Sequence, residues 1–170
     1  MPGCEVAMLN DYLAGAIPQT IERGRVLMAS IRRDLPRDYD ALRTTCKQRV
    51  NEEIEALQKL QKKDICNLEA WREFKRIVAN MDLIETVGVA ALNRASSADH
   101  RLNVLLEKIA REIDYPLLTP TVISLSQQYF CIYRQFNLLC IPLVEGHFLL
   151  HLPDLYHELA HPFLLRKTIP

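Results

Sequence analysis

The chain has 170 residues, of which 49% are hydrophobic and 25% are charged. These proportions are those of ordinary soluble globular proteins and exclude disorder of the whole chain. Lys and Arg number 21, as do Asp and Glu, so the formal net charge is zero, and we expect no nucleic acid or acidic membrane surface as a partner.

Three sequence features indicate the cellular compartment. No apolar run approaches the roughly 20 residues of a membrane span, and residues 1–5 lack the basic and apolar regions of a signal peptide. The five cysteines are an odd number and form no C-x-x-C pair. We therefore predict a cytoplasmic protein with reduced thiols and without a membrane span.

Residues 1–115 are predicted to be a helical domain. Pro18 would occupy the first turn of a helix running to about Leu35, where Pro36 breaks it. Over residues 38–94, which contain no proline and only one glycine, Gly88, apolar residues recur at steps of three and four. Those steps predict helix.

Polar and capping residues predict further helix boundaries within residues 1–115. The polar run 58–64 indicates a surface turn or an exposed face, and Asn67 could cap the helix that follows. Ser96 and Ser97 offer an N-cap for an amphipathic helix over 98–113. We expect a bundle of about four helices whose apolar stripes form a core. The alternative is a non-catalytic helical protein-interaction module, in which such a stripe is a partner-binding groove.

After Pro116 the pattern changes. Aromatic and β-branched residues predict a strand over 138–144, and residues 129–136 could be a second strand or a helix. Two cysteines in this apolar region, Cys131 and Cys140, are predicted to be small core residues. Leu152-Pro153-Asp154 then reads as the start of a helix, with proline and an acidic residue in its first turn.

That last helix contains the sequence His157-Glu158-Leu159-Ala160-His161. Histidines four residues apart project from one helix face, roughly 40° apart around the axis. Both imidazoles could therefore reach one metal ion, and the glutamate beside the first could activate a metal-bound water. Leu155 and Leu159 would form the neighbouring stripe, which faces the core.

This H-E-x-x-H pattern resembles the zincin metallopeptidases and, more loosely, their gluzincin branch. The resemblance covers residues 154–161 and implies an active-site helix packed on a small sheet. It also implies that His157 and His161 bind Zn²⁺, that Glu158 is the general base, and that a peptide or protein is hydrolysed. We thus expect an α+β, predominantly α fold, with a helical domain over 1–115 and the N-terminal part of a zincin-like domain over 116–170.

The chain departs from the family pattern in two respects. The ring of Pro162 would clash with the carbonyl of Glu158 at a cost of ~3 kcal/mol in an uninterrupted helix, so we expect the helix to end at His161. Residues 163–170 contain no third zinc ligand, which the family places downstream. We expect that ligand beyond Pro170, which would make the chain an N-terminal portion of a metallopeptidase, or upstream, among these residues: Glu145, His147 and His151.

Overall fold

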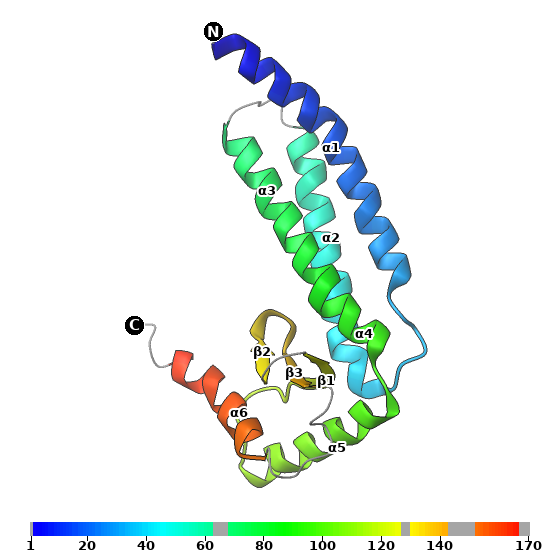
Figure 1. Cartoon of the computed structure of the whole chain (residues 1–170), viewed down its shortest axis with the longest axis vertical. Coiled ribbons are helices and arrows are strands. Elements are labelled where there is room, and N and C mark those ends of the chain that lie inside the picture. Colours follow the sequence, from blue (N-terminus) through cyan, green and yellow to red (C-terminus); the bar gives the residue numbers. More distant parts are fainter. Residues whose placement is uncertain (1, 63–67, 127–129, 143–151, 167–170) are drawn as a thin grey trace. The chain divides into compact units, whose positions relative to one another are not determined.

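A computed structural model describes residues 2–62, 68–126, 130–142 and 152–166 (Figure 1). It is predominantly helical with one three-stranded sheet, which confirms the α+β, predominantly α class. The chain forms two compact units: the first comprises 1–32 and 43–90, and the second 33–42 and 91–170. These units describe packing, so the domain boundary at 115 stays a prediction. No helix in the described ranges is long and apolar enough to cross a membrane.

Three long helices make up most of the first unit: α1 (Pro2–Ser30), α2 (Asp40–Lys62) and α3 (Leu68–Leu83). They run side by side in Figure 1. Pro18 lies inside α1, so the prediction that it starts the helix is wrong. Ile17 and Ile21 are buried on either side of it, and packing of this apolar face offsets the interior proline.

Gly24 lies where α1 approaches both other helices of the first unit. A Cβ atom built on Gly24 would lie 2.6 Å from Met81 Cε and 2.9 Å from Ile54 Cγ1. A side chain at position 24 would therefore displace the side chains of Met81 and Ile54. Around this point the core is made of apolar side chains from the three helices: Leu13, Ile17, Ile21, Val50, Leu57, Phe74, Ile77 and Met81.

The polar run that begins at Gln58 forms the exposed last turn of α2 as far as Lys62, which confirms the exposed face predicted for it. Its next residues, with Asn67, lie outside the described ranges. Helix α3 continues into a π-helix, Ile84–Val89, which contains Gly88, and then into α4 (Ala90–Arg94). A 3-10 turn, Arg37–Tyr39, precedes α2.

In the second unit, α5 (Ser97–Glu112) begins as predicted. Ser96 is its N-cap, and the Asp99 backbone N–H donates to Ser96 Oγ while Asp99 Oδ2 accepts from the Ser96 backbone N–H at 2.8 Å. This reciprocal pair is a capping box. The sequence grouped this helix with the N-terminal bundle, whereas it packs on the sheet of the second unit.

Two buried polar residues join α5 to β1 (Thr121–Ser126). Asn103 accepts a hydrogen bond from the Val122 N–H at 2.7 Å and donates one to the Val122 carbonyl at 2.9 Å. Asp99 Oδ1 accepts from the Ser124 N–H at 2.8 Å. These bonds satisfy backbone groups of a strand that has a sheet neighbour on one side only.

The sheet has the order β1-β3-β2, with β3 (Leu138–Pro142) in the centre. It pairs parallel to β1 and antiparallel to β2 (Cys131–Tyr133). The strand predicted over 138–144 is confirmed as far as residue 142. Residues 131–136 are a short strand followed by a 3-10 turn, and Asn137 then takes a left-handed conformation (φ 46°). Strand β1 was not predicted.

Helix α6 (Leu152–Arg166) begins at the predicted proline and aspartate. The prediction that it ends at His161 is wrong, because the helical backbone continues through Pro162. Apolar packing along α6 competes with the proline penalty. The side chains that pack on the core of the second unit are Leu152, Leu155 and Leu159.

Candidate metal centre

The candidate site lies on α6, and apolar packing determines which face of that helix it occupies. Leu159 is buried to 1% exposure, and Leu155 packs beside it. The core they join includes residues of α5, β1 and β3: Leu106, Ile109, Val122, Leu139 and Ile141. Because side chains four apart share a helix face, this stripe leaves His157 and His161 together on the adjacent face, as the sequence predicted.

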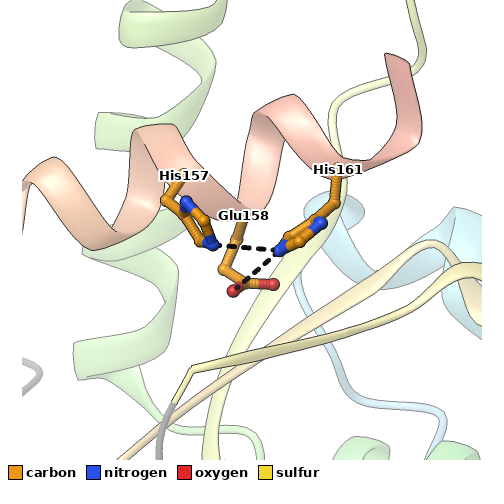
Figure 2. A group of neighbouring side chains, drawn as sticks. All are labelled: His157, Glu158 and His161. Carbon is orange, nitrogen blue, oxygen red and sulfur yellow. Dashed lines mark hydrogen bonds and ion pairs between the residues drawn. The ribbon is translucent and has the colours of Figure 1, made fainter. Parts of the chain in front are cut away.

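The three motif side chains converge on one side of the helix (Figure 2). The Nε2 atoms of His157 and His161 are 3.0 Å apart, with ring centroids at 4.6 Å and an interplanar angle of 84°. Glu158 Oε1 lies 3.8 Å from His161 Nε2. One ligand atom from each residue lies within 4.8 Å of the others.

This spacing fits a single small cation. Tetrahedral zinc with Zn–N bonds of about 2.0–2.1 Å holds two nitrogens about 3.3–3.4 Å apart, close to the observed 3.0 Å. Without a metal, the same two nitrogens can share one proton as donor and acceptor. Either arrangement needs the Nε2 atoms turned toward each other, and Figure 2 shows them so.

The site is open to solvent on its histidine side. His157 is exposed and the His161 side chain is 43% exposed, whereas that of Glu158 is only 13% exposed. A ligand could therefore approach the histidines directly while the carboxylate stays partly shielded. Such shielding strengthens the electrostatic effect of the carboxylate on a bound group.

The described residues supply no candidate ligand besides the three of the motif. In those ranges no further His, Cys, Asp or Glu joins the three motif residues within 4.8 Å. The upstream candidates, Glu145, His147 and His151, lie outside the described ranges, so their role stays a prediction.

Two cysteines near the site form a pair that the sequence did not indicate. Cys131 on β2 is directly opposite Cys140 on β3. Cys140 is buried, as predicted for a small core residue, but Cys131 is half-buried. Burial raises the pKa of the Cys131 thiol, and the negative charge of Glu158 raises that pKa further. No spacing rule predicts this pairing, because the segment between the strands contains a 3-10 turn, Arg134–Phe136.

No known protein-family model, curated protein or solved structure matches this chain.

Proposed function

We propose that the chain is a zinc-dependent metallopeptidase, with His157 and His161 as zinc ligands and Glu158 as the general base. The supporting observation is the convergence of the two Nε2 atoms, 3.0 Å apart, beside the Glu158 carboxylate. Two imidazoles four residues apart on a helix, with a carboxylate beside the first, form the pattern in which both histidines bind zinc and the glutamate acts as the general base.

The chain's own residues would divide the work as follows. His157 and His161 hold the ion through neutral Nε2 lone pairs, so each carries its proton on Nδ1. A bound zinc ion supplies a water of lowered pKa, about 7, and polarises the substrate carbonyl. Glu158 accepts the proton of the attacking water and returns it to the leaving amine nitrogen.

A catalytic zinc site has three protein ligands and one open position. We assign the third ligand to Glu145, His147 or His151, or to a residue beyond Pro170. Replacing each of the three with alanine should identify it, because loss of one ligand weakens zinc binding far more than loss of a bystander.

The experiment begins with zinc content after dialysis, measured by elemental analysis on the folded full-length protein. We expect about one zinc per chain, lost in His157→Ala and His161→Ala. His100→Ala, on α5, is the matched control and should keep its zinc. A wild-type protein with no more zinc than the His157→Ala/His161→Ala double variant would contradict the proposal.

Glu158→Gln separates chemistry from metal binding. The amide cannot accept a proton, so hydrolysis of a fluorescence-quenched peptide mixture should fall by about 10²–10⁴-fold. Zinc content should stay unchanged, since the two imidazoles remain. Equal activity in the wild type and Glu158→Gln would exclude the glutamate as the base.

The second candidate function is a helical protein-interaction module, which one feature of the first unit favours. A groove of about 470 Å³ between α1 and α3 is lined by Tyr12, Trp71 and Phe74. The Tyr12 ring meets Trp71 edge-on at 5.4 Å, and the Lys75 ammonium lies 5.1 Å from the Trp71 ring centre. Tyr12 is 55% exposed, and exposed aromatic residues are enriched at protein interfaces.

Trp71 offers a direct test of this groove because it is the only tryptophan in the chain. An apolar dye, anilinonaphthalene sulfonate, should bind there and quench Trp71 emission, and Tyr12→Ala should weaken that binding. The double variant His157→Ala/His161→Ala should bind the dye unchanged. A folded chain that leaves Trp71 emission unaffected by the dye would count against an open groove.

A further inference from the structure

We propose that Cys131 and Cys140 are a redox-modification site, at which a low-molecular-weight disulfide converts the two thiols into a reversible disulfide between β2 and β3. The first observation is register. The two residues are direct partners in the antiparallel pairing of these strands, which places their Cα atoms about 4.5–5.5 Å apart. Disulfides span Cα separations of about 4.4–6.8 Å, so the backbone already has the required geometry.

The second observation is that the two side chains lie on the same face and contact each other. Leu139 and Ile141 face the core shared with α5 and α6, so Cys140 between them points to the opposite face of the sheet. The two thiols are close enough for each to shift the pKa of the other. Both are free in the structure. Thus a rotation about the side-chain bonds, without a shift of either strand, would bring the sulfurs together.

The third observation is a difference in access. Cys140 is 2% exposed whereas Cys131 is half-buried, so an external reagent meets Cys131 first. Burial raises the pKa of Cys140 to about 12 and also raises the pKa of Cys131. Because the thiolate is the reacting species, the exchange is slow at neutral pH, and its selectivity comes from the proximity of the pair.

The reaction proceeds in two exchange steps. The Cys131 thiolate, having released its proton to water, attacks one sulfur of glutathione disulfide, forms a mixed disulfide and expels a glutathione thiolate. The Cys140 thiolate then attacks the Cys131 sulfur and expels the second glutathione. The protein loses two electrons and two protons, and one glutathione disulfide becomes two glutathiones.

Peptide mapping of the full-length chain tests this directly. After incubation with glutathione disulfide at pH 8, remaining thiols are blocked with N-ethylmaleimide and the protein is digested with trypsin. Cys131 and Cys140 then lie on different peptides, 112–134 and 135–166, and neither peptide holds another cysteine. We expect these two peptides joined, at their summed mass less two hydrogen atoms, and separated again by dithiothreitol.

Single variants provide the matched controls. Cys140→Ser should stop the reaction at the first step, with glutathione retained on peptide 112–134, and Cys131→Ser should give no linked species. Wild-type protein in which both peptides carry only maleimide or glutathione would overturn the proposal. So would equal linkage of Cys131 to Cys140 and to other cysteines, since that is the pattern of an unfolded chain.

Hydrogen exchange supplies a readout that does not depend on mapping. Strand β2 pairs only with β3 in the described sheet, so a cross-link should slow amide exchange in residues 131–133 by about tenfold or more. Exchange in α2, which belongs to the first unit, should stay the same. Unchanged exchange in residues 131–133 of the oxidised protein would overturn the structural consequence proposed here.

Discussion

The contacts inside the first compact unit differ in kind from those inside the second. In the first unit the described core is apolar, and at Gly24 the side chains of Met81 and Ile54 fill the space that a side chain would take. In the second unit, Asp99 and Asn103 are buried and bind backbone groups of β1. Helices can pack on one another through shape alone, whereas a helix that covers a strand edge has to satisfy backbone donors and acceptors. The two units should therefore fail under different substitutions.

The largest effect is expected at Asp99. Its carboxylate accepts from the Ser96 backbone N–H, the Ser96 hydroxyl and the Ser124 N–H, and it is 1% exposed. Asp99→Ala removes one half of the capping box and leaves buried donors without partners, which should cost about 3–5 kcal/mol of unfolding free energy. Urea unfolding followed by circular dichroism measures it.

Glu112→Ala, at the exposed end of the same helix, is the control and should change stability by no more than about 0.5 kcal/mol. A loss below about 1 kcal/mol in Asp99→Ala would mean that the buried hydrogen bonds do not distinguish the second unit. The comparison between the units would then lose its basis.

Gly24 is the corresponding position in the first unit. Gly24→Val should cost about 2–4 kcal/mol, because its side chain would enter space held by Ile54 and Met81. On the same helix, nothing lies within 4 Å of a Cβ built on Gly15. Gly15→Ala should therefore stabilise the protein by about 0.5–1 kcal/mol through helix propensity alone. If both substitutions stabilised the protein, close packing at Gly24 would be refuted.

Sequence patterns predict local features of this fold but not contacts between residues that are distant in the chain. The capping serine and the start of α6 were predicted because their signals are local: a capping residue, or a proline and an aspartate in a first turn. The roles of Asp99, Asn103 and Gly24 depend on groups far away in the chain, such as Ser124 and Ile54, whose proximity exists only after folding. Strand β1 was missed for a related reason, since its neighbours are Leu138 to Pro142 and residues of α5.

The candidate site also has features that the sequence predicts and features that it does not. That His157, Glu158 and His161 lie together follows from helical spacing, which the sequence shows directly. The pairing of Cys131 with Cys140 depends on strand register, which no spacing rule gives when the turn is a 3-10 segment. The prediction that Pro162 ends the helix was wrong because it considered only the energetic cost of an interior proline. It did not include the packing of Leu155 and Leu159 along the same helix.

The loss of stability at alkaline pH allows a buried thiol of the first unit to be compared with one of the second unit. Burial raises the pKa of Cys46, in the first unit, and that of Cys140, in the second, each to about 12. Above about pH 9 the unfolded chain loses these thiol protons while the native state keeps them, so stability falls as pH rises toward 12. By pH 10.5 each thiol should contribute a loss of about 2–2.5 kcal/mol relative to pH 8.

Cys46→Val removes the ionising group from the first unit at similar volume. Its unfolding free energy should fall by about 2–2.5 kcal/mol less than that of the wild type between pH 8 and 10.5. Cys140→Val should do the same for the second unit, and unfolding curves at the two pH values measure both. An identical pH dependence in all three proteins would show that neither thiol is protected from ionisation.

The smallest effect is expected at the surface of the first unit. Arg23 on α1 forms ion pairs with Asp82 on α3, at 2.6 Å, and with Glu85 in the π-helix. Both carboxylates raise the pKa of Arg23, and the hydrogen bond that Arg23 donates to Glu85 is the main cause. All three side chains are at least 39% exposed, so solvent screens the attraction. Arg23→Met should cost only about 0.5–1 kcal/mol at low salt and less in 1 M NaCl. A loss as large as that of Gly24→Val, unaffected by salt, would show that charge as well as shape holds the helices of the first unit together.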